Sequence, residues 1–251
     1  MAKPWILQVL GHELRWELIS HLRKSDLKAG ELVAATGQAQ NLVSYHLRLL
    51  RDAGLVRERR SSADGRDIYY SLDRRAATTG LYAALAAIGP STQRVPPGAA
   101  EGSPVAGRLA SVLFLCTGNS ARSQIAEAML RELAGRHILV RSAGTHPVGV
   151  HPRVQVVLES REMRVGNLRS KSVTEFGGQA FDYVVSLCDI ARTEPIQLTG
   201  NPRLVHWSIP DPVGTNGGRS RVAAAFDRVA NEIELRVEDF YADLRTQMSA
   251  A

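Results

Sequence analysis

The chain has little cysteine, few aromatic residues and no long apolar run. Of its 251 residues two are cysteine and 6% are aromatic, while 44% are hydrophobic and 22% are charged. The longest apolar runs, such as residues 81–88 and 112–116, are far too short to span a bilayer. These absences argue against a disulfide-rich scaffold and a helical membrane protein. The ordinary composition indicates a globular protein.

The N-terminus also lacks the pattern of a secretory signal. Residues 1–5 are not a charged segment leading into a long apolar core and a small-residue cleavage site. We therefore expect a cytoplasmic protein in which Cys116 and Cys188 are free thiols with a chemical or a packing role. A structural disulfide between them would suit an oxidising compartment instead.

The formal net charge of +6 is concentrated in the first third of the chain. Residues 1–90 contain 13 Lys and Arg against 9 Asp and Glu, whereas the remaining 161 residues contain 18 against 16. Arginines cluster at Arg57, Arg59 and Arg60. This excess suits a polyanionic partner, although a solvated basic face would have the same composition.

A segment rich in Pro, Gly, Ala and Ser, residues 89–107, has little to bury and reads as a linker. We therefore predict one domain over residues 1–90, a linker over 91–108 and a second domain over 109–251.

The first domain is predicted to be mainly helical, with one hairpin. Apolar residues at helical spacing predict helices over residues 5–23 (one or two), 30–36, 41–53 and 76–88. Strand-like residues 55–60 and 67–72 flank an Asp-Gly pair, which is typical of a β-hairpin.

The second domain shows strands and helices in alternation. Strands are predicted over residues 110–115, 138–141, 183–187 and 204–207, and helices over 123–133, 152–162 and 221–244. Such alternation is typical of an α/β fold with a doubly wound parallel sheet.

The most informative segment is a Cys-x5-Arg loop between a strand and a helix. Cys116 ends an apolar strand, and Arg122 stands where the next helix begins. A thiol at a helix N-terminus, facing backbone N–H groups and an arginine, ionises below its usual pKa of about 8.5. The same N–H groups bind a tetrahedral oxyanion, and an arginine holds two of its oxygens. We predict that Cys116 is a nucleophile and Arg122 an oxyanion clamp; the alternative is a buried core cysteine and a surface arginine.

The whole loop is expected to contact the oxyanion. Gly118 lets the backbone approach the ligand closely, and Asn119 braces the loop. Ser123 donates to the sulfur and caps the helix. The predicted oxyanion-binding residues are Thr117, Gly118, Asn119, Ser120, Ala121, Arg122 and Ser123.

The departing oxygen of such a reaction must also be protonated. Asp211 lies between two prolines after a predicted strand, and therefore near the carboxyl edge of the sheet, where ligands bind in such folds. We predict that Asp211 is the general acid; an Asp-Pro pair in isolation is usually a turn.

These motifs resemble the low-molecular-weight tyrosine phosphatases and the arsenate reductases that share their fold. The resemblance runs from about residue 109 to 240. It rests on Cys116–Glu127, Ser142–Thr145, Ser170–Ser172 and Asp211–Pro212, which fall in family order. It implies the same three roles for Cys116, Arg122 and Asp211.

Three details favour a reductase over a phosphatase. Gln124 stands where phosphatases typically have proline, and residues 213–218 lack the tyrosines that phosphatases often carry. Residues 186–189 look like the reductase segment that bears a second cysteine, here Cys188. Thioredoxin-coupled members use a third cysteine, and this chain has Pro195 there.

Two routes to product therefore stay open. Cys188 forms a disulfide with Cys116, or a small thiol attacks the Cys116–arsenate adduct while Cys188 is only a buried hydrophobe. Either route needs an external reductant, either a small thiol or a glutaredoxin- or thioredoxin-type protein. No bound cofactor is expected.

The first domain resembles the winged helix-turn-helix of the ArsR repressor family. Residues 30–36, 43–47, 50–56 and 67–70 carry the resemblance, which implies binding to double-stranded DNA as a homodimer. Residues that would face base edges or phosphates are Gln40, Asn41, Ser44, Tyr45, Arg48, Arg59, Arg60 and Arg66. A winged helix kept only for dimerisation is the alternative.

Arsenite-sensing members hold the metalloid with closely spaced cysteines, but residues 1–115 contain none. His12, His21 and His46 are scattered and predict no metal site. The leading hypothesis is thus an arsenate reductase fused to an ArsR-like DNA-binding regulator. The alternatives are a protein-tyrosine phosphatase and a transcriptional regulator with an oxyanion-sensing domain.

Overall fold

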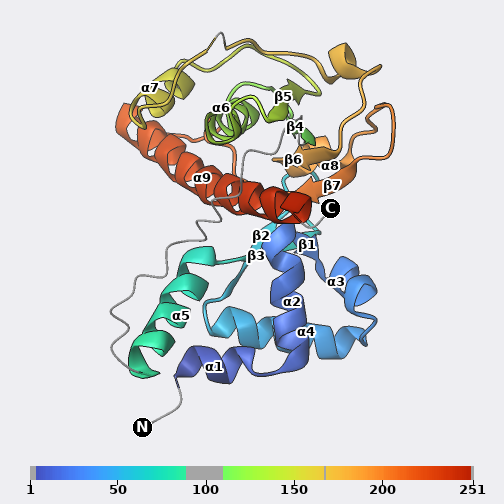
Figure 1. The fold of residues 1–251 in the computed structure, drawn as a ribbon, viewed down its shortest axis with the longest axis vertical. Helices are drawn as coiled ribbons and strands as arrows, with labels where there is room; N and C mark the ends of the chain where they lie inside the picture. Colours follow the sequence, from blue (N-terminus) through green and yellow to red (C-terminus); the bar gives the residue numbers. More distant parts are fainter. Residues whose placement is uncertain (1–3, 89–109, 167, 250–251) are drawn as a thin grey trace. The chain divides into compact units, whose positions relative to one another are not determined.

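The computed structural model describes residues 4–88, 110–166 and 168–249 (Figure 1). The chain divides into two compact units, Met1–Ser103 and Pro104–Ala251. Each unit has its own hydrophobic core. The linker predicted over residues 91–108 lies outside the described residues.

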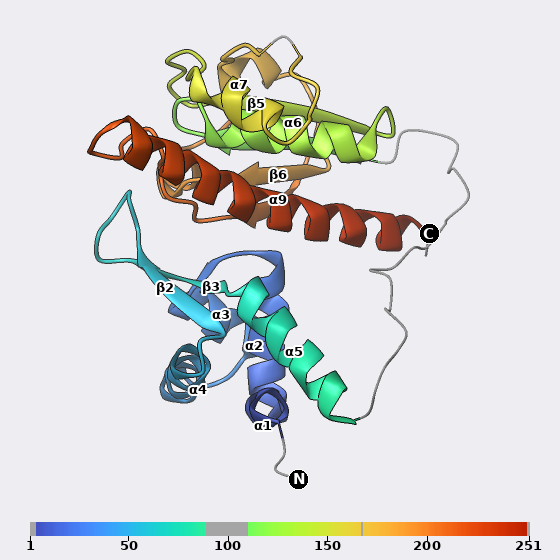
Figure 2. The same ribbon diagram turned by 90° about the vertical axis from the view of Figure 1, so that its left-hand side faces the viewer.

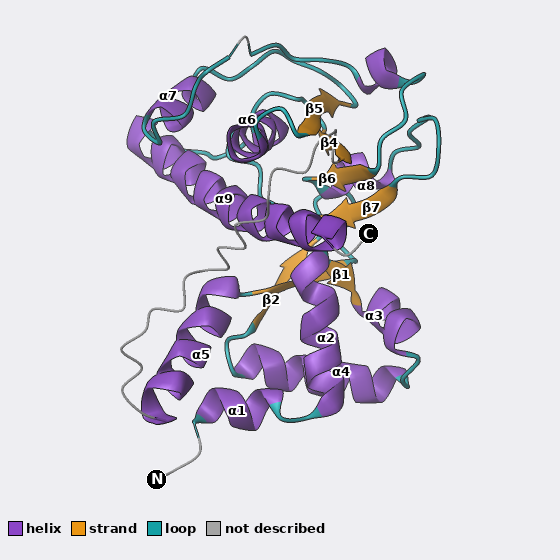
Figure 3. Ribbon diagram, viewed as in Figure 1, coloured by secondary structure: helices purple, strands orange, loops and turns teal. Residues whose placement is uncertain are grey.

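The first unit consists of helices around a small antiparallel sheet (Figure 3). Its helices are α1 (Trp5–Leu10), α2 (Glu13–Lys24), α3 (Ala29–Thr36), α4 (Gln40–Asp52) and α5 (Arg74–Ile88). Its strands are β1 (Leu27–Lys28), β2 (Val56–Arg60) and β3 (Ile68–Leu72), in the order β1-β3-β2. The predicted hairpin is confirmed as β2 and β3, whose register pairs Val56 with Leu72.

The predicted first helix is two helices, because the chain turns at Gly11 and His12. The His12 Nδ1 accepts the backbone N–H of Leu14 at 3.2 Å, which satisfies one free donor at the start of α2. Helix α4 buries Val43, Leu47 and Leu50 at helical spacing, and Gly54 follows it with a φ of 72°. The opposite face of α4 is left to solvent.

The second unit is built on a parallel sheet with strand order β5-β4-β6-β7. The strands are β4 (Ala110–Cys116), β5 (Ile138–Gly144), β6 (Tyr183–Ser186) and β7 (Arg203–His206). All seven residues of β4 are buried, as expected for a central strand covered on both faces. The predicted doubly wound parallel sheet is confirmed.

The helices of this unit flank the sheet. They are α6 (Arg122–Ala134), α7 (Arg153–Glu159), α8 (Asp189–Thr193) and α9 (Arg219–Ser249), with a 3₁₀ turn η1 (Val173–Phe176). Helix α6 contacts β4 and β5, and α9 packs alongside α6 (Figures 1 and 2). Helix α7 is shorter than predicted because the chain turns after it, with Glu162 at a φ of 57°. Within the described ranges, no helix combines the length and the apolar character needed to cross a membrane.

The strand order places a topological switch point at the carboxyl edge of the sheet, beside β4. The chain leaves β4 toward β5 on one side, whereas β6 lies on the other side of β4. Ligands bind at such a switch point in doubly wound sheets. Cys116 is the last residue of β4, and Cys188 follows β6 by two residues, so both thiols lie at this edge.

Candidate active site

The loop from Cys116 to Arg122 is held with its carbonyl groups facing outward. The carbonyl oxygens of Cys116, Thr117, Gly118 and Ser120 accept backbone N–H groups from residues 145–151. In a trans peptide the N–H points opposite to the C=O. The N–H groups that follow these carbonyls therefore point away from that segment, as in an anion-binding nest of backbone amides.

Two backbone features give the loop this shape. Asn119 has a left-handed conformation with a φ of 44°, which asparagine tolerates better than most residues. Gly144 at the end of β5 lies against the loop. A Cβ there would be 2.6 Å from the Thr117 carbonyl oxygen and 2.8 Å from the Asn119 nitrogen. The close approach of the two backbones thus requires glycine at position 144.

The nucleophile candidate is buried beside a hydroxyl group. Cys116 is 1% exposed, and its Sγ lies 3.0 Å from the Ser123 Oγ. The Asn119 Nδ2 donates to the same Ser123 Oγ at 2.8 Å. The expected cap by Ser123 is wrong, because Ala121 is the N-cap residue and Ser123 lies in the first turn of α6. Its hydroxyl faces Cys116 and Asn119 instead.

Arg122 joins the loop to the predicted general acid. The buried guanidinium of Arg122 donates to the Ile209 carbonyl oxygen at 3.1 Å. Its other terminal nitrogen lies 3.1 Å from the Asp211 Oδ2, and half of the Asp211 side chain is exposed. The structure therefore brings Asp211, from a distant segment of the chain, against Arg122 at the end of the loop that begins with Cys116. An arginine at one carboxylate and one carbonyl can exchange the carboxylate for an incoming oxyanion.

Cys188 belongs to the same edge of the sheet. It is 2% exposed, it is the N-cap residue of α8, and its Sγ lies 3.3 Å from the Thr117 Oγ1. Burial raises the pKa of the Cys188 thiol, and the neighbouring Cys116 adds to that rise. The charge of Arg122 and the hydrogen bond with Thr117 act in the opposite direction on this pKa.

A second set of polar residues lies behind the loop and was given no role in the sequence analysis. Gln124, Glu127 and Ser142 are buried, and Lys171 forms an ion pair with Glu127 at 3.0 Å. The available signal was the run of polar residues on α6, a helix whose other buried positions are apolar. Burial of a polar side chain follows from tertiary packing, so the sequence pattern did not identify these partners.

The predicted DNA contacts divide into two groups. Gln40, Asn41, Ser44, Tyr45 and Arg48 all lie on α4 and are exposed, and the Arg48 guanidinium lies 5.6 Å from the centre of the Tyr45 ring.

The other group lies in the hairpin and is held by intramolecular contacts. Arg59 Nη1 donates to the Arg60 carbonyl oxygen, and Arg60 Nη1 donates to the Gly65 carbonyl oxygen. Arg66 forms an ion pair with Asp64 at 3.0 Å.

Comparison with known proteins identifies both segments. Residues 111–250 match the family model of the low molecular weight phosphotyrosine protein phosphatases. The chain belongs to this family. Residues 12–58 match the model described as bacterial regulatory protein, arsR family, and the first unit carries this helix-turn-helix segment.

Relatives of the phosphatase-family domain are arsenate reductases. The arsenate reductase of Staphylococcus xylosus is 34% identical over 130 residues, which are 52% of this chain and 95% of that protein. That of Halalkalibacterium halodurans is 33% identical over 129 residues, 51% of this chain and 93% of that protein. A solved arsenate reductase in the phosphate binding state is 27% identical, with a TM-score of 0.47 over 54% of this chain and 98% of its own. The two sequence relatives, from Staphylococcus xylosus and Halalkalibacterium halodurans, favour the arsenate reductase over the phosphatase reading.

Proposed function

We propose that the phosphatase-family domain is an arsenate reductase with Cys116 as its nucleophile. The observation that carries the proposal is the contact set at the carboxyl edge of the sheet. The Cys116 thiol lies 3.0 Å from the Ser123 hydroxyl, in a backbone loop closed by the Arg122–Asp211 ion pair. The sequence similarity to arsenate reductases supports arsenate as the oxyanion that this site binds. Its negative charge is shared by several oxygens.

The first step joins Cys116 to arsenic. Arsenate takes the place of Asp211 at Arg122, and Asp211 then acts in its protonated form. The Cys116 thiolate attacks the arsenic atom and forms an S–As bond, while one As–O bond breaks and that hydroxyl leaves as water with the proton of Asp211. Arg122 and the loop N–H groups stabilise the remaining oxygens. Arsenic is still pentavalent in this adduct.

The second step reduces arsenic. The Cys188 thiolate attacks the Cys116 sulfur, the S–As bond breaks, and its electron pair stays on arsenic, which leaves as arsenite. The two thiols become a disulfide, so two electrons pass from sulfur to arsenic. The 3.3 Å contact between Cys188 and Thr117, the neighbour of Cys116, supports this role. An external thiol then reduces the disulfide directly, because Pro195 occupies the place of a third cysteine.

The first unit completes the proposal as a DNA-binding regulator. The exposed residues of α4 would enter the major groove, and the hairpin arginines would meet phosphates. Dimerisation is proposed through α1 and α5, which contact one another and expose Trp5, Leu81, Tyr82 and Leu85. DNA and a reducing thiol pool both suit the cytoplasm. In this proposal the DNA-binding domain spans residues 1–90 and the reductase domain spans residues 109–251.

The test is the production of arsenite from arsenate by the purified chain. We expect activity with at least one thiol donor, loss of activity in Cys116→Ser, and a disulfide between Cys116 and Cys188 when the donor is withheld. Activity that persists in Cys188→Ser with a small thiol would instead assign the second attack to that thiol.

The phosphatase alternative is measured on the same preparations. Hydrolysis of p-nitrophenyl phosphate together with no arsenite from any thiol donor would replace the reductase assignment by a phosphatase assignment. If Cys116→Ser kept both activities, Cys116 would be the nucleophile of neither reaction, and both assignments would be withdrawn.

A further inference from the structure

Gln124 lies directly behind the oxyanion loop. It is 1% exposed, and its Nε2 lies 2.8 Å from the Asn119 Oδ1, 3.2 Å from the Asn119 carbonyl oxygen and 2.9 Å from the Arg169 carbonyl oxygen. One amide therefore ties the left-handed residue of the loop to the segment before η1. A buried amide that satisfies three acceptors holds its neighbours in one geometry.

These contacts decide which way the Asn119 side chain faces. Its Oδ1 accepts from the Gln124 Nε2 and from the Lys171 backbone N–H at 2.8 Å. A flipped amide would place its NH₂ group against both of these donors. The Asn119 Nδ2 must then point to Ser123 at 2.8 Å and to Ser142 at 2.9 Å.

The orientation of the Asn119 amide fixes which groups donate and which accept in the hydrogen bonds that lead to Cys116. The Ser142 hydroxyl donates to the Glu127 carboxylate, so it can accept the first N–H of Asn119. Ser123 accepts the second, which leaves the proton of its own hydroxyl for the Cys116 sulfur 3.0 Å away. A hydroxyl that donates to sulfur favours the thiolate over the thiol.

We propose that Gln124 is a positioning residue that orients the Asn119 amide so that Ser123 donates to the Cys116 thiolate. The inference rests on the proposed role of Cys116 as the nucleophile. It also gives a physical meaning to the glutamine found where phosphatases of this family typically have proline. A proline there has no side-chain donor for Asn119 or for the Arg169 carbonyl oxygen.

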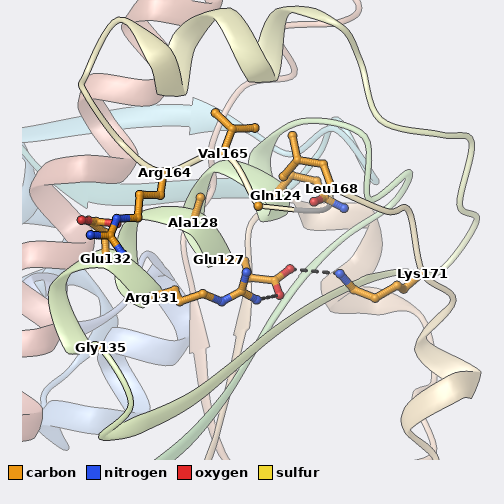
Figure 4. Close-up of a pocket in the computed structure, with 11 residues that line it drawn as sticks. Gln124, Glu127, Ala128, Arg131, Glu132, Gly135, Arg164, Val165, Leu168 and Lys171 are labelled. Atoms are coloured by element: carbon orange, nitrogen blue, oxygen red, sulfur yellow. Dashed lines mark hydrogen bonds and ion pairs between the residues drawn. The ribbon is translucent and has the colours of Figure 1, made fainter.

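The surroundings leave room to test this role by substitution. A pocket of about 500 Å³ lies against α6, lined by Gln124, Glu127, Arg131, Leu168 and Lys171 among others. Figure 4 shows Gln124 on its wall, with Glu127 between Arg131 and Lys171. A side chain of similar size at position 124 can relax toward this space, so overpacking does not obscure the effect.

The experiment uses the full chain with Cys188→Ser, in which Cys116 is the only thiol. Gln124→Leu removes the donors, and Gln124→Glu places a carboxylate against three acceptor oxygens, the Asn119 Oδ1 and the Asn119 and Arg169 carbonyl oxygens. Gln155→Leu is the matched control, because Gln155 is exposed on α7, where its Nε2 donates to the Glu159 carboxylate at 2.7 Å. The rate of iodoacetamide alkylation is measured against pH, with and without arsenate.

Gln124→Leu is expected to shift the pH profile so that alkylation of Cys116 at neutral pH slows about tenfold, and to weaken protection by arsenate about tenfold. Gln124→Glu is expected to do more, and Gln155→Leu nothing. A wild-type pH profile in Gln124→Leu, with circular dichroism that shows a folded chain, overturns the proposal. Gln124→Met, also without a donor, replaces the leucine variant if that does not fold, and the same shift is expected. Because alkylation needs no turnover, these outcomes are separate from a failure to produce arsenite.

Discussion

At the scale of single residues, the site is a buried thiol whose neighbours are all held by other protein groups. Cys116 contacts Ser123, Ser123 contacts Asn119, and Arg122 is bound to Ile209 and Asp211. Such pre-organisation lowers the cost of arranging donors during the reaction. In the proposed mechanism, the oxyanion displaces the Asp211 carboxylate from Arg122 instead of ordering a loop.

Asp211→Asn tests the general acid. An amide cannot donate a proton to the leaving oxygen, so kcat for arsenate is expected to fall by about 10²–10⁴-fold. The limb of the pH profile that reports loss of the acid is expected to disappear. The assay is initial arsenite formation across pH 5–9. Asp227→Asn, on the remote helix α9, serves as the control, and an unchanged profile in Asp211→Asn would remove the proton donor from this residue.

The reacting residues could be named from the sequence, whereas their support could not. Cys116, Arg122 and Asp211 stand out because each has a local context of strand, helix start or proline pair, and the structure places Arg122 against Asp211. Gln124 and Ser142 have no such context. Their role depends on which buried atoms face them across the fold, and spacing along a chain does not encode that.

At the scale of elements, β5 supports the loop through its last residue. In Gly144→Ala the added methyl group would lie 2.6 Å from the Thr117 carbonyl oxygen, which forces the two backbones apart. We expect a loss of stability of roughly 1–3 kcal/mol and a weaker affinity for arsenate. Gly178→Ala is the control, because its Cβ would meet nothing within 4 Å.

Equilibrium binding of arsenate to the Cys116→Ser form of each variant gives the comparison. If Gly144→Ala bound arsenate as tightly as Gly178→Ala, the close approach of Gly144 to the loop would not be needed for arsenate binding.

The stability of the first unit is expected to depend on pH through His46 of helix α4. His46 is 4% exposed, its Nδ1 has no hydrogen-bond partner within the described residues, and its ring lies 4.3 Å from that of His12. Burial lowers the pKa of His46, and the charges of His12 and Arg15 lower it further. The unfolded chain therefore takes up this proton first as the pH falls. The stability that neutral His46 contributes is present above about pH 6.5 and is lost as the pH falls toward the lower folded pKa.

Hydrogen exchange of α2 and α4 amides, corrected for the intrinsic rate, measures this loss between pH 7.5 and 5. The decline in protection is expected to flatten in His46→Gln, which cannot titrate, and to persist in His21→Gln. A decline of equal slope in both variants would assign the pH dependence to other groups.

Helices and strands with a clear periodic spacing of apolar residues were predicted well, whereas very short elements were missed. The hairpin and the helices α4, α6 and α9 follow from apolar spacing and turn residues. β1 and α8 span two and five residues, too few for any period to show, and both exist because neighbouring strands position them. Helix α8 matters most, since it holds Cys188 at its N-terminus.

At the scale of the whole molecule, the chain combines a DNA-binding segment without thiols and a catalytic domain that holds both. Residues 1–115 contain no cysteine. A thiol-seeking ligand such as arsenite therefore has no thiolate site in the first unit. Any response of DNA binding to such a ligand must begin at Cys116 or Cys188, or depend on groups other than thiols.

An apolar surface on α1 and α5 supports the proposed dimer of the DNA-binding unit. Leu81, Tyr82 and Leu85 are 40–59% exposed on α5, beside the half-exposed Trp5 of α1. Three large apolar side chains on one short helix are costly in water and typical of a subunit interface. Tyr82→Glu with Leu85→Glu is expected to convert a dimer into a monomer, because each charge would lose its hydration at the interface. Light scattering after gel filtration measures the mass.

The same variant separates the two activities. In the proposed dimer the α4 helices of the two chains read two half-sites, so the monomer is expected to bind duplex DNA at least tenfold more weakly. Arsenite formation should be unchanged, because the substituted residues lie outside the catalytic domain. Leu204→Glu, at a residue 77% exposed in the second unit, is the control and should remain dimeric. A double variant that stays dimeric would place the interface elsewhere, and a wild-type monomer would remove the proposed pairing of two DNA-binding units.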